Sequence, residues 1–187
     1  MKKLFAVFAL VAFTFVGASI ASAQKMEDPM VGGAPMYPTK DIVDNAANSK
    51  DHTTLVAAVK AAGLVDTLKS AGPFTVFAPT NDAFAKLPTG TVDTLLKPEN
   101  KVALTKVLTY HVVAGSLSAD DLEKAIKAGH GTAELKTVSG GKLWVMAKGK
   151  NGITLKDEKG GVSNLTIADV FQSNGVIHVV DSVLLPR

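Results

Sequence analysis

Cysteine is absent from the 187-residue chain. The chain therefore forms no disulfide, holds no metal through thiolates and has no cysteine nucleophile. A lipoprotein anchor at the amino terminus is excluded as well, because that anchor is attached to a cysteine. Aromatic residues make up only 6% of the chain, so we expect a core built mainly from valine, leucine, isoleucine and alanine. About 150 residues can bury enough apolar surface to fold without disulfides.

Arginine occurs once, at Arg187, and the overall charge is modest. The formal net charge is +3, and it falls to +1 if residues 1–23, which contain two lysines and no acidic residue, are removed. Nucleic-acid-binding proteins usually combine clustered basic residues with base-stacking aromatic residues. Neither pattern is present in the sequence, so a nucleic acid is not the expected partner.

Residues 1–23 have the pattern of a secretory signal peptide. Lys2 and Lys3 precede an almost wholly apolar run at 4–16, and Ala21-Ser22-Ala23 has the form of a cleavage site. The apolar run is shorter than the ~20 residues that cross a bilayer, so a membrane anchor fits the pattern less well. We expect a periplasmic or secreted (extracellular) protein with no transmembrane segment after cleavage.

The rest of the chain divides near residue 40. Residues 24–40 hold three prolines and two adjacent glycines with little periodicity, which predicts a flexible linker. The linker methionines Met26, Met30 and Met36 are irregularly spaced and predict no copper site. Residues 41–187 are expected to form one domain.

Hydrophobic periodicity changes within this domain. Residues 41–128 are mainly helical in pattern, and Ser118 with Asp121 predicts a clear helix start. Asn151-Gly152 and Asn174-Gly175 are expected to form hairpin turns with positive φ. Helices followed by strands predict an α+β fold. From Thr132 onward the period of two predicts strands over 134–138, 143–148, 153–156, 164–171, 176–180 and 182–185.

No arrangement of catalytic or metal-binding residues is found in the sequence. The four histidines, His52, His111, His130 and His178, have no metal-ligand spacing, and Gly-x-Ser-x-Gly is absent. Because His178 lies in an alternating apolar run, we interpret it as a hydrogen-bonded core histidine. Asp157-Glu158 is interpreted as a solvated turn. The sequence therefore predicts a non-catalytic protein with no metal and no cofactor.

Two segments identify a family. Residues 75–88 read Thr-Val-Phe-Ala-Pro-Thr-Asn-Asp-Ala-Phe-Ala-Lys-Leu-Pro, and residues 175–186 read Gly-Val-Ile-His-Val-Val-Asp-Ser-Val-Leu-Leu-Pro. They resemble, in this order, the first and second conserved boxes of the fasciclin domain. Tyr110-His111 resembles the Tyr-His element that lies between these boxes. The resemblance covers about residues 41–187.

The resemblance implies a fold and a structural role for the boxes. The fold is a compact wedge in which helices of the N-terminal half pack against a β-sandwich-like pair of sheets in the C-terminal half. Asn81 and Asp82 are expected to fix the turn after the first strand, and His178 is expected in a core strand. The residues assigned to this structural motif are Phe77, Pro79, Thr80, Asn81, Asp82, His178 and Asp181.

The resemblance also implies a function. Family members are mostly extracellular adhesion or interaction modules, so we expect a cell-surface or matrix protein or polysaccharide as the partner of a monomer. Adhesive sites in animal relatives are assigned to positions that correspond to Tyr110, His111, Asp169 and Val170, the last with valine in place of isoleucine. Some microbial relatives bind carotenoids. The alternative is therefore a carrier of an apolar small molecule, which requires an apolar groove open to solvent.

Overall fold

The computed structural model describes residues 28–149 and 152–187. The predicted signal peptide at 1–23 lies outside these residues, and so does Asn151 of the first predicted hairpin turn. Within the described residues, helices dominate up to Ala128 and strands dominate from Thr132 onward. The α+β prediction is therefore confirmed.

The helices lie mainly in the N-terminal half, and polar side chains cap several of them. Thr80 Oγ1 accepts a hydrogen bond from the Ala83 N–H at 3.2 Å, and Ser118 with Asp121 forms the predicted capping box. The helices are α1 (Ile42–Asn48), α2 (Thr53–Ala62), α3 (Val65–Lys69), α4 (Asn81–Ala85), α5 (Thr91–Leu95), α6 (Lys101–Tyr110) and α7 (Ala119–Ala128), with 3₁₀ turns at Lys50–His52 and Pro98–Asn100.

Seven strands form one sheet in the order β4-β3-β9-β8-β7-β6-β5. Neighbouring strands are antiparallel except β3 and β9, which run parallel. A separate hairpin pairs β1 (Met30–Val31) with β2 (Ala34–Pro35). The strands of the large sheet are β3 (Phe74–Pro79), β4 (Val112–Ala114), β5 (Thr132–Lys136), β6 (Lys142–Lys148), β7 (Gly152–Lys156), β8 (Val162–Gln172) and β9 (Gly175–Val180).

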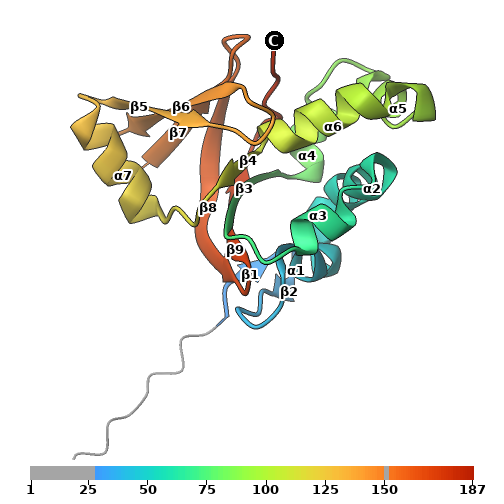
Figure 1. Cartoon of the computed structure of the whole chain (residues 1–187), viewed down its shortest axis with the longest axis horizontal. Coiled ribbons are helices and arrows are strands. Elements are labelled where there is room, and N and C mark those ends of the chain that lie inside the picture. The colour runs from blue at the N-terminus through green and yellow to red at the C-terminus, as the bar shows by residue number, and fades with distance from the viewer. Residues whose placement is uncertain (1–27, 150–151) are drawn as a thin grey trace, which may run out of the picture.

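The long strand β8 belongs to both halves of the sheet. Residues 162–164 pair with β7, whereas residues 165–172 pair with β9. Register shifts between Leu165 and Val170 interrupt the second pairing, and such irregularities bend a strand. The expected pair of sheets is thus built as two halves of one hydrogen-bonded sheet. In Figure 1, β8 runs between the half that contains β5–β7 with α7 and the half that contains α1–α6.

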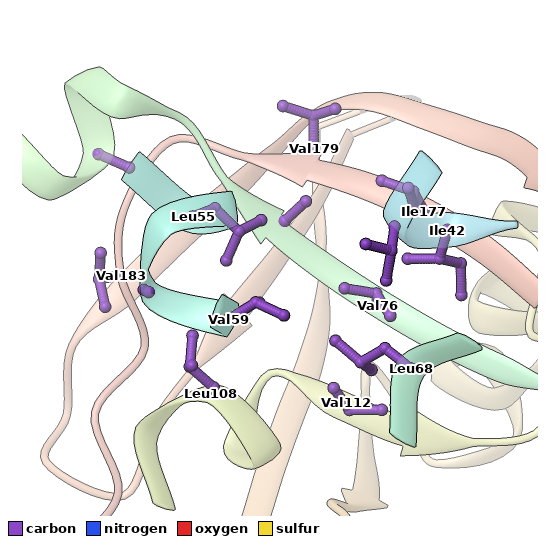
Figure 2. Close-up of a cluster of buried hydrophobic side chains, with 14 of the residues drawn as sticks. Ile42, Leu55, Val59, Leu68, Val76, Leu108, Val112, Ile177, Val179 and Val183 are labelled. Atoms are coloured by element: carbon purple, nitrogen blue, oxygen red, sulfur yellow. The ribbon is translucent and has the colours of Figure 1, made fainter. Parts of the chain in front are cut away.

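Two hydrophobic clusters fill the interior. The first packs helices α1, α2, α3 and α6 against β3 and β9. Figure 2 shows part of it, including Leu55 of α2, Leu108 of α6 and Val76 of β3. The second packs Leu122 of α7 against the inner face of β5–β7 and includes Phe77. Because side chains alternate along a strand, β3 contributes Val76 to the first cluster and Phe77 to the second.

Residues 28–40 differ from the loosely ordered linker that their composition suggests. Val31 and Met36 are buried in the first cluster. The turn between β1 and β2 is formed by Gly32 and Gly33, whose φ angles are 59° and 76°. The Lys50 N–H donates to the Gly32 carbonyl at 3.2 Å and so joins this hairpin to the 3₁₀ turn between α1 and α2. Glycines that suggest flexibility in the sequence here supply a required turn conformation. The division of the chain at residue 40 stays a prediction.

The segment after β9 is not the strand predicted over 182–185. Val183 and Leu184 are buried, but side chains rather than a neighbouring strand hold their backbone. The Leu184 N–H donates to His111 Nε2 at 2.9 Å, and the Leu185 N–H donates to Asp157 Oδ2 at 2.9 Å. An extended apolar segment can therefore be buried without joining a sheet.

The hairpin between β8 and β9 turns at Ser173-Asn174, and the prediction of positive φ at Asn174 is wrong. The buried Asn174 side chain instead joins three backbone groups. Its Oδ1 accepts the Ile42 N–H at 3.0 Å, and its Nδ2 donates to the carbonyls of Leu68 at 2.7 Å and Ser70 at 3.0 Å. One asparagine thus ties the hairpin to α1 and α3.

Replacing Asn174 by alanine is expected to lower the free energy of unfolding by about 2 kcal/mol, because unsatisfied buried backbone groups cost about 1–3 kcal/mol. Urea denaturation of the variant and the wild type measures the difference. Asn48→Ala is the matched control, since the exposed Asn48 side chain donates only to the Asp44 carbonyl on the surface of α1. The control is expected to change stability by less than about 0.5 kcal/mol. Equal stability of the two variants would contradict the role of Asn174.

Candidate functional site

The two fasciclin-like boxes meet as neighbouring parallel strands. Phe77 of β3 is paired with His178 of β9 in the strand register. Their ring centroids lie 5.7 Å apart with an interplanar angle of 25°, and both side chains are 0% exposed. The two boxes, which are far apart in the sequence, therefore meet through these two stacked side chains inside the core.

The His178 ring holds two backbone groups. Its Nδ1 accepts the Asp169 N–H at 3.2 Å, and its Nε2 lies 2.8 Å from the Leu117 carbonyl oxygen. Since Nδ1 accepts, Nε2 carries the proton and donates, which defines a neutral imidazole. Burial lowers the pKa of His178 below its ordinary value and so favours this form. His178 therefore links β9 to β8 and to the segment that precedes α7.

His111 has the same role at the end of α6. Its Nε2 accepts the Leu184 N–H at 2.9 Å, so Nδ1 carries the proton and donates to the Val107 carbonyl at 2.8 Å. Burial lowers the pKa of His111 to about 4. The neutral ring thus joins α6 to the C-terminal segment, and both of its nitrogens are occupied.

Tyr110 is fully buried beside His111. Its hydroxyl donates to the Lys142 carbonyl and accepts the Glu158 N–H at 3.1 Å. Burial raises the pKa of Tyr110 to about 12, so the hydroxyl stays protonated and can donate. Tyr110 therefore connects α6 to β6 and to the turn between β7 and β8.

Replacing Tyr110 by phenylalanine is expected to lower the free energy of unfolding by about 1–2 kcal/mol, because the Lys142 carbonyl and the Glu158 N–H lose their common partner. Tyr37→Phe is the matched control, since Tyr37 is an exposed tyrosine and its ring lies under the Lys40 ammonium group. Urea denaturation measures both variants. A Tyr110→Phe protein as stable as Tyr37→Phe would show that the hydroxyl adds nothing to the fold.

Asp169 and Val170 lie in the irregular part of β8. Asp169 has a φ of 59°, and its Oδ1 accepts the Ala119 N–H at 2.7 Å in the first turn of α7. Val170 is 0% exposed, and Tyr110 and His111 are buried as well. Of the four positions expected at a partner-binding surface, only Asp169 has a partly accessible side chain. The other three are used in packing and hydrogen bonding, so direct contact with a partner is not available to them in this conformation.

The polar residues of the first box connect helices. Asn81 Oδ1 accepts the Thr54 N–H at 3.0 Å, and Asn81 Nδ2 donates to the Lys50 carbonyl at 2.8 Å. Asn81 therefore reaches beyond its own turn and ties α4 to the start of α2. Pro79 ends β3, and the exposed Asp82 carboxylate lies in the first turn of α4, where negative charge is favourable.

Asp181 closes the second box. Its Oδ1 accepts the Asn164 N–H at 2.8 Å and its Oδ2 accepts the Asn164 Nδ2–H at 2.8 Å, while the Lys86 ammonium lies 3.9 Å from Oδ2. Partial burial alone would raise the pKa of Asp181, but hydrogen bonds from Asn164 and Ser182 outweigh it and lower the pKa to about 2. The ionised carboxylate thus joins the end of β9 to the start of β8.

The sequence predicts a solvated turn at Asp157-Glu158, and this prediction is wrong for Asp157, which is 3% exposed. Asp157 Oδ1 accepts the Gly161 N–H at 2.6 Å, and Oδ2 accepts the Leu185 N–H. Glu158 Oε2 accepts the Arg187 N–H at 3.0 Å. The two acids hold the C-terminal segment in place. Nothing local in the sequence indicates the partners Leu185 and Arg187, because they lie on a different part of the chain.

An apolar pocket of about 60 Å³ lies between the helices and β3–β4. Leu55 and Val59 of α2 face Leu108 of α6 across it, and Val112 lies at the β4 side; Figure 2 shows these side chains around one space. Val138, which is 48% exposed, also lines the pocket, so the pocket reaches the surface. An apolar ligand is the chemistry that such a lining accommodates.

The comparisons with known proteins agree with this geometry. The family model for the fasciclin domain matches residues 50–186. The chain belongs to the fasciclin domain family. Its relatives include "Protein sll1483" of a Synechocystis species, which is 45% identical over 181 residues, covering 96% of this chain and 91% of that protein. The cell surface glycolipoprotein MPB83 of Mycobacterium bovis is 34% identical over 160 residues, covering 86% of this chain and 61% of that protein.

The fasciclin domain described here also resembles a solved structure. A FAS1 domain pair from the insect cell adhesion molecule fasciclin I aligns with a TM-score of 0.69 and 20% identity, covering 79% of this chain and 51% of that chain. This likeness confirms the fold. No enzyme family is indicated by these matches. Within residues 28–149 and 152–187, none of the helices combines the length and apolar character needed to cross a bilayer.

Proposed function

We propose that this fasciclin domain is a non-catalytic interaction module that acts in the periplasm or outside the cell, where it binds a protein or polysaccharide partner. The observation that carries this proposal is the use of the motif side chains inside the fold. His111, His178 and Tyr110 each hold backbone groups from distant segments. An imidazole whose two nitrogens are both hydrogen-bonded to backbone groups of other residues in the same protein is not free to act as a general base. The motif side chains therefore stabilise the fold, which is the role expected in a scaffold for interaction.

Two similar proteins support the location and the kind of role. MPB83 is named a cell surface glycolipoprotein, and fasciclin I is an insect cell adhesion molecule. The predicted signal peptide at 1–23 provides a route to the same compartments. An interaction module outside the cytoplasm is consistent with each of these observations.

The test is binding of labelled, purified protein to intact cells of its own source and to the polysaccharide extracted from their surface. Saturable binding that excess unlabelled protein displaces is the expected result. Cell fractionation and N-terminal sequencing accompany it, with cleavage expected after Ala23. Absence of saturable binding to either material, or an uncleaved protein in the cytoplasmic fraction, would contradict the proposal.

Asp169 is our candidate for direct contact among the four motif positions, because its carboxylate is partly accessible. Asp169→Asn removes the charge but keeps an oxygen that can accept the Ala119 N–H, so the fold is expected to persist. We expect weaker binding to cells than for the wild type. The matched control is Asp82→Asn, which neutralises an exposed carboxylate on the far helix α4. Unchanged binding by Asp169→Asn would remove this site and leave the interaction-module proposal in place.

A carrier of an apolar small molecule is the second candidate function, and the apolar pocket favours it. A cavity of about 150 Å³ accommodates benzene, whereas this pocket measures about 60 Å³. The pocket in this conformation is therefore too small for the end group of a carotenoid. A carrier role requires Leu55 and Leu108 to move apart, and the chain of the ligand would then leave past Val138. Organic extraction and a visible absorption spectrum of protein from its native source test the idea. A colourless preparation without extractable lipid would reject it.

A further inference from the structure

The outer face of β5–β7 carries the one tryptophan of the chain, Trp144. In β6, the fully buried Leu143 and Val145 alternate with the half-buried Trp144 and Met146. Leu143 and Val145 belong to the cluster that includes Leu122 of α7, so Trp144 and Met146 point to the opposite face. Figure 1 shows α7 against one side of β5 and β6. Trp144 therefore lies on the side of this half-sheet that α7 does not cover.

A groove of about 500 Å³ runs beside Trp144. The strand register places Glu134, Trp144 and Lys156 in one row across β5, β6 and β7. Lys159 and Arg187 line the same groove. The site thus combines one aromatic ring with three cationic side chains.

The two acidic side chains that line the groove accept hydrogen bonds from the backbone, whereas its two lysines form no salt bridge with another described residue. Glu158 accepts backbone N–H groups from Lys142 at 2.9 Å and from Arg187 at 3.0 Å, and the Asp157 carboxylate is turned inward to Leu185. In the part of the chain that the structure describes, Lys156 and Lys159 have no carboxylate within salt-bridge distance. Their ammonium groups are therefore unpaired. The ionisable side chains that line the groove, three basic and two acidic, sum to a formal charge of +1, which favours an anion.

We propose that this groove binds an acidic polysaccharide, with the indole of Trp144 against the apolar face of a sugar ring and Lys156 and Lys159 paired with its carboxylates. The inference rests on the proposed function and names its partner class. An indole offers a large flat apolar surface with little conformational entropy to lose, and ammonium groups form strong charge-assisted hydrogen bonds with carboxylates. An exposed groove with one aromatic residue lacks the closed apolar pocket that anchors a protein partner. It also lacks the broad apolar face that a membrane surface requires.

Because Trp144 is the only tryptophan, its fluorescence reports on this groove directly. The full-length protein is titrated with oligogalacturonate and, separately, with uncharged dextran of similar length. We expect a saturable change of Trp144 emission with oligogalacturonate only, and an apparent Kd that rises at least about tenfold between 50 and 500 mM NaCl because salt screens exposed charges. No emission change, or an equal change with dextran, overturns the proposal.

Two double variants separate a local site from a general charge effect. Lys156→Gln/Lys159→Gln is expected to weaken oligogalacturonate binding by about tenfold, since two charge-assisted contacts are lost. Lys97→Gln/Lys101→Gln removes the same charge from exposed positions in the helical half and is expected to bind as the wild type does. Equal weakening by both variants overturns the site. Tighter binding of polyglutamate than of oligogalacturonate overturns the choice of a polysaccharide.

The same variants distinguish this proposal from the proposed function. If wild type binds intact cells saturably and Lys156→Gln/Lys159→Gln binds them equally well, the groove proposal fails and the interaction module stands. If the wild type binds oligogalacturonate but no cell or matrix material, the groove stands and the proposed function fails. Loss of cell binding in Lys156→Gln/Lys159→Gln but not in Lys97→Gln/Lys101→Gln supports both proposals.

Discussion

Replacing Phe77 by alanine is expected to lower the free energy of unfolding by about 3–5 kcal/mol. The side chain is 0% exposed, and it stacks on His178 at the centre of the second hydrophobic cluster. Removing the ring leaves a cavity between β3, β9 and the half-sheet β5–β7, against which α7 packs. It also removes the contact that holds the His178 imidazole against its backbone partners. A loss of this size is a large part of the ~5–15 kcal/mol that stabilises a typical domain.

Urea denaturation of Phe77→Ala and the wild type, with the midpoint and slope fitted together, measures this effect. Phe171→Ala is the matched control, because Phe171 lies on β8 with 46% of its surface exposed. The control is expected to lose less than about 1 kcal/mol. A loss below 1 kcal/mol for Phe77→Ala would mean that the two boxes do not meet in the core.

Acidification from pH 7 to pH 4 is expected to remove about 3 kcal/mol of stability through His111 alone. The folded-state pKa of His111 is about 4, below the 6.5 of an unfolded histidine. Between these values the unfolded chain binds more protons than the folded protein, so stability falls as the pH falls through this window. Burial also lowers the pKa values of His178 and His52, and these groups act in the same direction.

The measurement is the free energy of unfolding at several pH values for wild type and for His111→Gln. Carboxylates titrate in both proteins, so their contribution cancels in the difference. The stability advantage of the wild type over His111→Gln is expected to shrink by about 3 kcal/mol from pH 7 to pH 4. His130→Asn is the control, because His130 is exposed and asparagine tolerates its left-handed φ of 54°. A pH-independent difference between wild type and His111→Gln would contradict the neutral, buried state of His111.

Several elements could be predicted from the sequence because their signals are local. The apolar alternation around His178 predicts a buried strand, and Ser118 with Asp121 predicts a helix start, since a cap needs only its own first turn. The order of helices and strands predicts the α+β class. The likeness of residues 75–88 and 175–186 to the fasciclin boxes identified the family, which the match over residues 50–186 confirms.

The candidate site was less accessible to sequence reasoning. Tyr110, His111 and Val170 correspond to positions that are assigned to adhesive sites in animal relatives. In the structure, each of them is buried by residues that are distant in the sequence. The position of Asp157 between Lys156 and Lys159, before Gly160-Gly161, predicts a surface turn. Its partner, the Leu185 N–H, belongs to a segment that itself looked like a strand. Such pairings depend on which segments the fold brings together.

By itself, the sequence determined the mainly helical character of residues 41–128, the strands from Thr132 onward other than 182–185, and the family, because caps, periodicity and box motifs act over a few neighbouring residues. Only the tertiary structure decided that β3 and β9 pair in parallel, that Asn174 joins α1 and α3, and that Trp144 shares a groove with Lys156 and Lys159. The reason is physical. Burial and charge environment depend on long-range contacts, and a hydrogen bond between residues 42 and 174 leaves no local pattern in the chain.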